Sequence, residues 1–246
     1  RKFSQAAMAC LPDPDWQVSE NHLQKRWDLT DRPICSVDPP GCTDIDDALH
    51  CIKLSNPYAN EQDGSKQLYE VGIHIADVTA FVQHGSALDR EAAERGTTVY
   101  LVDRRIEMLP TLLTSNLCSL MGNVKRLAFS VLLKMDQDAN VVSAEFGRSV
   151  ICSREAMTYE KAQNRLDAYR KGLKSAETQG KVVESGNRKG SGKSSSIQQG
   201  GPPAPPPSGT PGTSVAAVSK DSDRSLNESL LNLATLAAKL REKRMQ

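Results

Sequence analysis

Alternation of apolar and polar residues marks the clearest strands of this chain. Apolar side chains stand at every second position in one run: Leu127, Phe129, Val131, Leu133 and Met135. This is the period of a strand that turns one face towards a core. A turn-rich run follows at 136–140, and alternation resumes through 146–152. The pattern therefore predicts a β-hairpin across residues 127–152.

Further elements are predicted on either side of this hairpin. Residues 34–37 form a short apolar strand, and residues 68–78 form a longer one in which apolar side chains again alternate. Ser86 is placed to cap a short helix, which Gly96 is placed to end just past its last turn. Residues 158–169 also have helical spacing. The chain thus mixes strands with helices.

The last part of the chain repeats apolar residues at helical spacing. They are Leu226, Leu230, Leu233, Ala234, Ala237 and Leu240. Ser225 and Glu228 have the spacing of a capping box, which begins a helix by satisfying free backbone N–H groups. We therefore predict an amphipathic helix whose apolar stripe needs a packing partner.

Composition divides the chain into three parts. Residues 1–170 carry every aromatic side chain and can build a core. Residues 171–222 are rich in Gly, Ser, Lys and Pro, and we expect a disordered insert because they cannot bury enough apolar surface. Residues 223–246 hold the amphipathic helix, which continues the first domain. The expected fold class is α+β, with a mixed, partly antiparallel sheet and surrounding helices.

The charge balance excludes no class of partner, whereas the cysteine spacing and the lack of long apolar runs argue against a zinc protein and a membrane protein. The 31 Lys and Arg residues nearly balance the 30 Asp and Glu residues, so the overall charge neither favours nor excludes a polyanionic partner. The six cysteines form no CxxC pair, which argues against a zinc site. We find no signal peptide and no apolar run of membrane-spanning length, and expect a nuclear and cytoplasmic protein. Because the chain opens on Arg1, we interpret it as a fragment.

Four carboxylates crowd into ten residues directly after the strand at 34–37. They are Asp38, Asp44, Asp46 and Asp47. Like charges this close resist ionising together, unless a cation compensates them. Ligands that are all oxygen favour Mg²⁺, with Mn²⁺ as an alternative, and such an ion can bind a phosphodiester and activate water. The spacing leaves open a simpler interpretation, in which solvated carboxylates only close turns.

Two other acidic motifs fit this segment poorly. A calcium-binding loop that started at Asp44 would need Gly at its sixth position, where Leu49 stands. A phosphatase of the aspartyl-phosphate type would match Asp44 and Asp46 but needs Thr or Val where Ala48 stands. Neither alternative explains the cluster.

The acidic segment resembles the signature of a known family. Residues 38–50 read DPPGCTDIDDALH, which is similar to the active-site signature of the ribonuclease II (RNB) family. Segments similar to that family follow in the same order: VGIHIADV at 71–78, GTTVYL at 96–101, residues 108–110 and LCSL at 117–120. The resemblance covers residues 3–168 and resumes at 225–244.

This resemblance implies a magnesium-dependent 3′-to-5′ exoribonuclease that releases nucleoside 5′-monophosphates. It implies that the four aspartates are the metal-site and catalytic residues, with Asp46 the most critical for cleavage. It also implies that Tyr100 stacks on nucleotides near the 3′ end, whereas without the resemblance Tyr100 is better explained as a core or half-buried strand residue. Both His74 and Asp77 are expected to be structural.

The resemblance implies single-stranded RNA as a partner. Because the sequences of these segments are most similar to the exosome-associated eukaryotic branch of the family, it also implies exosome core subunits, bound through regions absent from this chain. The arginine-rich segment that grips the scissile phosphate in the family is also outside this sequence. Within it, Arg104, Arg105 and Arg126 are open candidates for phosphate contacts or for ordinary ion pairs. The alternative function is a non-catalytic RNA-binding or assembly module.

Overall fold

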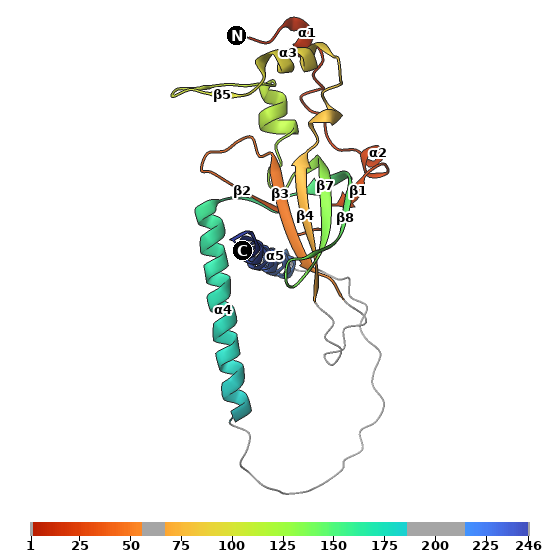
Figure 1. Cartoon of the computed structure of the whole chain (residues 1–246). Coiled ribbons are helices and arrows are strands. Elements are labelled where there is room, and N and C mark those ends of the chain that lie inside the picture. Colours follow the sequence, from red (N-terminus) through yellow and green to blue (C-terminus); the bar gives the residue numbers. More distant parts are fainter. Residues whose placement is uncertain (1, 56–66, 186–214, 246) are drawn as a thin grey trace, which may run out of the picture.

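A seven-stranded sheet forms the centre of the chain (Figure 1). The computed structural model describes residues 2–55, 67–185 and 215–245, with only the backbone described at 177–185 and 215–220. The strand order is β1-β8-β7-β4-β3-β2-β9. The strands are β1 (Trp27–Leu29), β2 (Cys35–Asp38), β3 (Asp47–Lys53), β4 (Leu68–Ala76), β7 (Lys125–Asp136), β8 (Val141–Cys152) and β9 (Glu155–Thr158).

The pairing confirms the mixed sheet and the predicted hairpin. Strands β7 and β8 pair antiparallel with Leu127 opposite Val150, while β1 pairs with β8 and β2 with β9 in parallel. Ala139 has a φ of 60° in the tight turn of the hairpin, where Asn140 N–H donates to the Asp136 carboxylate at 2.9 Å. The turn-rich residues therefore close the hairpin as their chemistry predicts.

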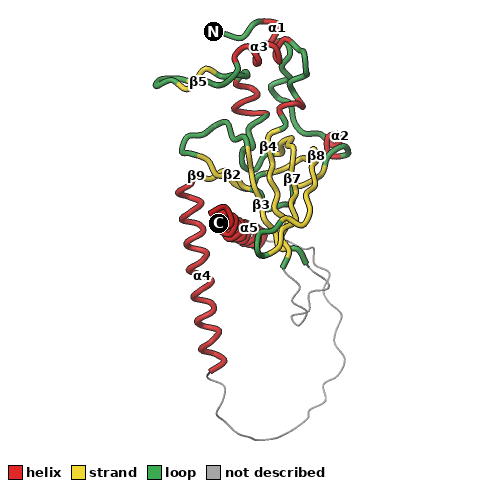
Figure 2. The backbone as a smooth tube through the Cα atoms, in the orientation of Figure 1, coloured by secondary structure: helices red, strands yellow, loops and turns green. Residues whose placement is uncertain are grey.

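Besides a 3-10 turn at Val78–Ala80 and a π-helical turn at Leu113–Leu117, five α-helices and a small second sheet lie around the central strands in the described residues (Figure 2). They are α1 (Gln5–Met8), α2 (Glu20–Leu23), α3 (Ala87–Arg95), α4 (Tyr159–Ser185) and α5 (Val215–Met245), with the two-stranded pair β5 (Val99–Tyr100) and β6 (Arg105–Ile106). Helix α3 confirms the prediction made from its ends. The Ser86 hydroxyl accepts from Asp89 N–H at 3.1 Å, and Gly96 follows the helix with a φ of 73°.

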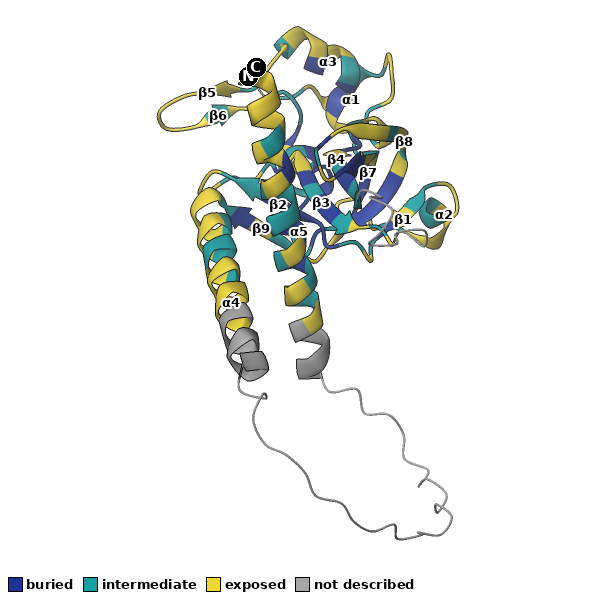
Figure 3. Cartoon of the chain, turned by 60° about the horizontal axis from the view of Figure 1, so that its bottom comes forward, coloured by how far each residue is buried: buried dark blue, intermediate teal, exposed yellow. Residues whose placement is uncertain are grey.

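Apolar residues cover the two faces of the sheet in different ways. One face, which carries Ala48 of β3 and Ala128 of β7, is covered by the larger core. The fully buried side chains of this core include Ile34, Leu88, Leu113, Leu117, Leu120 and Ile151. On the opposite face Leu236 of α5 packs against Cys51 and Val71. The apolar stripe of the last helix therefore finds its partner within this chain, and α4 is left largely exposed (Figure 3).

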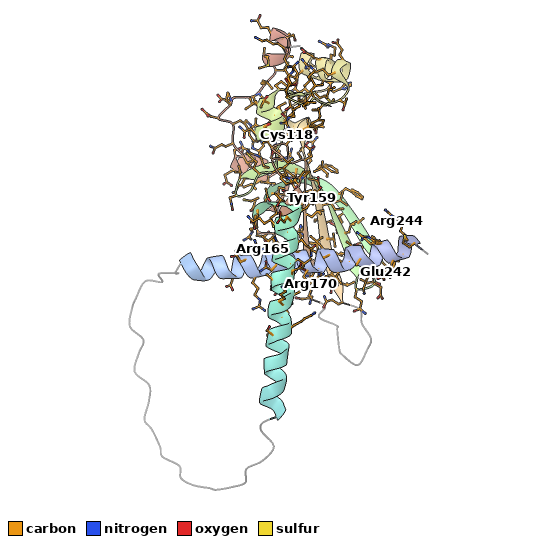
Figure 4. The ribbon with its side chains drawn as sticks, turned by 90° about the vertical axis from the view of Figure 1, so that its left-hand side faces the viewer. Cys118, Tyr159, Arg165, Arg170, Glu242 and Arg244 are labelled. Carbon is orange, nitrogen blue, oxygen red and sulfur yellow. The ribbon has the colours of Figure 1, made fainter. Side chains whose placement is uncertain are left out.

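Helix α4 crosses α5, with Arg165 at the crossing (Figure 4). Its guanidinium forms ion pairs with Glu155 and with Asp223, the latter at 2.7 Å, and donates to Asn227 at 2.6 Å. One arginine thus ties β9 and α5 to α4.

Both helices are longer than the sequence predicted. Helix α4 continues to Ser185 and α5 already begins at Val215, so the ends of the expected 171–222 disordered insert are helical, and 186–214 lie outside the described residues. These ends contain no proline and many good helix formers. The predicted capping box was also wrong, because α5 begins before it. Ser225 lies inside α5, and Glu228 accepts from Arg224 at 3.1 Å.

All six cysteines are free thiols, and three of them are buried: Cys35, Cys51 and Cys118. Across the parts of the chain that the structure describes, no helix combines the length and apolar character needed to cross a membrane.

Candidate functional site

The acidic loop, residues 38–47, joins two neighbouring strands of the sheet. Asp38 ends β2 and Asp47 begins β3, and these strands pair antiparallel. The loop turns at once, because Gly41 has a φ of 81° and Cys42 N–H donates to the Pro39 carbonyl at 3.2 Å. Proline followed by a residue of positive φ is typical of a type II turn. The local sequence thereby returns the first and last aspartates to the same edge of the sheet.

Ser119 holds the middle of the acidic loop through two hydrogen bonds. Its hydroxyl accepts from Ile45 N–H at 3.1 Å and donates to the Thr43 carbonyl at 2.9 Å, while Ile45 is itself buried in the main core. On the other side, Ala76 N–H donates to the Asp46 carbonyl at 2.9 Å. These three hydrogen bonds therefore hold the loop backbone in place.

Crowding and burial perturb two of these carboxylates in the same direction. Burial raises the pKa of Asp46, and the negative charges of Asp44, Asp47 and Asp38 raise it further. Burial also raises the pKa of Asp38, with Asp47 and Asp44 adding to the effect. Asp38 Oδ2 is buried without a hydrogen-bond partner. The nearby Ser36 hydroxyl partly opposes the rise at Asp38, although Ser36 Oγ also lacks a partner of good geometry.

Asp44 is compensated by an arginine instead. Arg105 Nη1 lies 2.6 Å from Asp44 Oδ1. Burial acts to raise the pKa of Asp44, but the hydrogen bond and the charge of Arg105 outweigh it and hold that pKa below its usual value. The same pairing raises the pKa of Arg105. One of the four negative charges is thus neutralised from within the chain.

The donor set suits a hard cation, but the carboxylates do not converge on one point. Among the described residues, no group of three or more His, Cys, Asp or Glu side chains is arranged to hold a metal ion. The oxygen-only chemistry, the raised pKa values and the unpartnered Asp38 oxygen fit Mg²⁺ or Mn²⁺. A metal at this loop therefore stays a prediction.

Tyr100 lies on the small hairpin beside the acidic loop. It is 70% exposed and pairs across the hairpin with Arg105, so it is not the half-buried strand residue that its neighbours favour. The charge of Asp44 is the largest influence on Tyr100 and raises its pKa, with a smaller contribution from Asp46. An accessible aromatic ring thus stands within electrostatic range of the aspartates.

The structure separates the three candidate arginines. Arg105 contacts the acidic loop directly, whereas Arg104 is exposed and pairs with its neighbour Asp103 at 3.1 Å. Arg126 is buried and donates to the Ser119 carbonyl at 3.0 Å, so it supports the segment beneath the loop. Its burial lowers its pKa. Sequence reasoning could not rank these residues, because the distinction depends on partners far along the chain.

A chain of buried polar side chains crosses the sheet next to the acidic loop. This polar chain consists of His50, His74, Ser130 and Ser149, with Glu70 at its outer end. His50 Nδ1 lies 2.8 Å from His74 Nε2, and His74 Nδ1 lies 2.7 Å from Ser130 Oγ. The structural role predicted for His74 fits these contacts. His50 was not predicted from the sequence, because only the pairing of β3 with β4 places it on the same face as His74.

Asp77 is also structural. Its carboxylate lies 2.7 Å from Arg26 Nη2 and accepts from Thr79 Oγ1 at 2.6 Å, and both members of the ion pair are buried. Burial acts to raise the pKa of Asp77, but these hydrogen bonds and the charge of Arg26 lower it overall. Asp77 therefore holds the segment after β4 rather than joining the acidic loop.

Comparison with known proteins places this arrangement in a family. The profile of the RNB domain matches residues 26–246. The chain belongs to the RNB domain family. It is 51% identical to exosome complex exonuclease RRP44 of Mus musculus over 166 residues, which are 68% of this chain and 16% of that protein. It is 45% identical to DIS3-like exonuclease 2 of Xenopus tropicalis over 166 residues, which are 67% of this chain and 19% of that protein.

The RNB chain thus spans about one sixth of the length of RRP44. Among solved structures, it is similar to Mycoplasma genitalium RNase R in complex with ribose-methylated single-stranded RNA, with a TM-score of 0.62, 19% identity, and coverage of 99% of this chain and 29% of that one. It is also similar to yeast Ssd1, described as a pseudonuclease, with a TM-score of 0.50, 23% identity, and coverage of 63% and 18%. At these identities, the structural likeness shows the fold alone.

Proposed function

We propose that this RNB chain is part of the catalytic domain of a magnesium-dependent 3′-to-5′ exoribonuclease, which hydrolyses single-stranded RNA to nucleoside 5′-monophosphates. The observation that carries the proposal is the acidic loop, which places four carboxylates within ten residues at one edge of the sheet, two of them with raised pKa values. Arg105 neutralises Asp44, and a bound cation would relieve the repulsion among the remaining carboxylates while keeping them ionised.

Each residue of the site has a proposed role. The oxygens of Asp38, Asp44, Asp46 and Asp47 would hold Mg²⁺, or Mn²⁺ in its place, and the ion would supply an activated water and stabilise the departing oxygen. Asp46 is the most important of the four for cleavage. The exposed ring of Tyr100 would stack on a base near the 3′ end, since every base offers a flat face to an aromatic side chain.

A second candidate function rests on two observations. The fold is also that of a protein described as a pseudonuclease, and within the described residues the carboxylates are not gathered into a metal site. Both favour a non-catalytic RNA-binding or assembly module as the alternative. A shared fold does not by itself carry an activity, so the two candidates must be separated by experiment.

Partner binding belongs to the same proposal. Several relatives are named as exosome complex exonucleases. We propose that the full-length protein assembles with exosome core subunits, through segments beyond the part that this chain covers, and works in the nucleus and cytoplasm. Co-purification of core subunits with the tagged full-length protein, but not with this chain alone, is the expected result.

The activity test uses the full-length protein and single-stranded RNA labelled at its 5′ end. With Mg²⁺, we expect stepwise shortening from the 3′ end and mononucleotides that carry a 5′ phosphate. Asp46→Asn should slow this degradation by more than about 1,000-fold, because it removes a metal-binding charge. RNA binding in EDTA should change little.

Asp103→Asn is the matched control. It makes the same chemical change on the neighbouring hairpin, where Asp103 is exposed and pairs with Arg104. This variant should degrade RNA like the wild type. Equal activity of the wild type and Asp46→Asn would contradict the metal-site assignment. A wild type that binds RNA without shortening it would favour the non-catalytic module.

A further inference from the structure

The hairpin that carries Tyr100 needs an anchor. Strands β5 and β6 have two residues each and form a sheet of their own, which extends away from the central sheet (Figure 1). Val102 at its tip is fully exposed, as are large parts of Val99 and Leu101. An isolated two-stranded hairpin is only marginally stable in water. The position of Tyr100 therefore depends on what ties this hairpin to the rest of the molecule.

Arg105 makes that connection with all of its guanidinium nitrogens. Nη1 lies 2.6 Å from Asp44 Oδ1, and Nη2 donates to Thr43 Oγ1 at 3.0 Å, both in the acidic loop. Nη2 also donates to Ser115 Oγ at 3.3 Å, and Nε lies 2.6 Å from Glu107 Oε1. The side chain is about three-quarters buried, with 26% exposed. Its contacts therefore join the hairpin to the acidic loop, 61 residues away at Asp44, and to the segment of Ser115.

We propose that Arg105 is a positioning residue that clamps the Tyr100 hairpin onto the acidic loop and so fixes the distance between the base-stacking ring and the carboxylates. This inference rests on the proposed function, and it adds the residue that couples the two halves of the site.

Register and side-chain chemistry explain why one residue can do this. Tyr100 and Arg105 are direct partners across the hairpin, so moving one strand moves the other. The planar guanidinium offers several donors in a fixed geometry, which a lysine ammonium cannot reproduce. The Asp44 charge also acts on Tyr100, which agrees with their proximity. Removing Arg105 should therefore loosen Tyr100 without touching its ring.

The first test measures hydrogen exchange of the full-length protein without RNA. Arg105→Met should speed amide exchange in the 97–108 segment by about 10-fold, because the contacts that anchor the hairpin are lost. Exchange across strand β4 should stay as in the wild type, which shows that the fold persists. The control is Arg104→Met, an equal change at the adjacent arginine, which is 67% exposed, and it should leave the hairpin unchanged.

The second test is a double-mutant cycle on RNA affinity. Binding of fluorescent single-stranded RNA is measured in EDTA, so that cleavage and metal binding do not contribute. Tyr100→Ala and Arg105→Met should each weaken RNA binding about 10-fold. The double variant should lose about the same 10-fold in affinity as either single variant, because Arg105 acts through Tyr100. Additive losses of about 100-fold would overturn the proposal.

The two tests separate this inference from the proposed function. Unchanged hairpin exchange in Arg105→Met overturns the clamp even if the enzyme degrades RNA. If the wild type neither binds nor degrades RNA, the proposed function fails, and the exchange experiment still decides whether Arg105 anchors the hairpin. Faster exchange together with a non-additive cycle supports the full inference.

Discussion

The acidic loop and the polar chain are two neighbouring regions that share strand β3. The strand begins in the acidic loop at Asp47 and carries His50 of the polar chain three residues later. Both regions gather titratable groups within a folded protein, but they differ in how those groups are satisfied. In the polar chain each buried group has a neighbour, as where His74 lies between His50 and Ser130. In the acidic loop, Asp38 Oδ2 is buried without a partner and Asp46 is repelled by its neighbours.

This difference indicates what each region is for. A buried polar network whose members satisfy one another stabilises a unique packing of strands. A cluster of like charges costs stability and persists where the charges serve a ligand. The polar chain therefore belongs to the structure of the sheet, whereas the acidic loop is the candidate for function. Substitutions in the two regions should have opposite signatures.

The largest expected effect is a loss of activity without a loss of stability. Asp38→Asn should slow Mg²⁺-dependent RNA degradation by the full-length protein about 1,000-fold, equivalent to about 4 kcal/mol. The free energy of unfolding should be unchanged or higher, because the substitution removes a repelled charge whose pKa burial raises. Activity assays and urea denaturation measure the two quantities. A destabilised variant with normal activity would reverse the comparison.

The next effect lies in the polar chain and should have the opposite signature. A Cβ added at Gly72 would lie 2.2 Å from His50 Cε1, in a region with no room to shift. Gly72→Ala should therefore destabilise the fold by about 2–3 kcal/mol in urea denaturation. Gly172→Ala is the control, because nothing lies within 4 Å of that added Cβ in α4. It should stabilise the helix by up to about 1 kcal/mol.

The pH dependence of stability separates the regions further. Burial and the neighbouring His50 lower the pKa of His74 from 6.5 to about 3. The unfolded chain therefore binds a proton that the folded chain refuses, and stability falls as the pH drops below 6.5. Between pH 6.5 and 5, above the usual pKa of carboxylates, we expect a loss of about 1 kcal/mol per pH unit.

His74→Gln should flatten this slope in urea denaturation at several pH values. The control His84→Gln changes a fully exposed histidine and should leave the slope as it is. Asp38 contributes with the opposite sign, because its raised pKa makes the folded state bind a proton more readily as the pH falls. Asp38→Asn should accordingly steepen the loss below pH 5. A flat profile for the wild type would show that His74 is not held neutral.

The smallest effect compares two buried serines. Ser130 Oγ lies 2.7 Å from His74 Nδ1 and 2.6 Å from Ser149 Oγ, whereas Ser36 Oγ lacks a partner of good geometry. Ser130→Ala should cost about 1–2 kcal/mol of unfolding free energy, because it leaves a buried ring nitrogen unsatisfied. Ser36→Ala should change stability by less than about 0.5 kcal/mol. Equal costs would mean that Ser36 is bonded after all.

The local chemistry of the sequence was enough to determine several elements. Alternation predicted the 127–152 hairpin, and Ser86 with Gly96 predicted the ends of α3, because caps and turns depend on neighbouring residues. The order of the RNB segments predicted the family, which the profile match confirms. The acidic loop was also visible as a crowded run of charges. What these features share is that every group needed for the prediction lies within a few residues.

Tertiary structure decided the features that depend on distant partners. Arg105 meets Asp44 across 61 residues, and His50 meets His74 across 24, so no local pattern could single them out. The lengths of α4 and α5 also escaped prediction, because composition does not show where packing lets a helix continue. The sequence alone therefore determined which residues can carry charge and where the hairpin and the ends of α3 lie. Only folding decided which charges are neutralised, because that depends on distances between segments that the chain brings together.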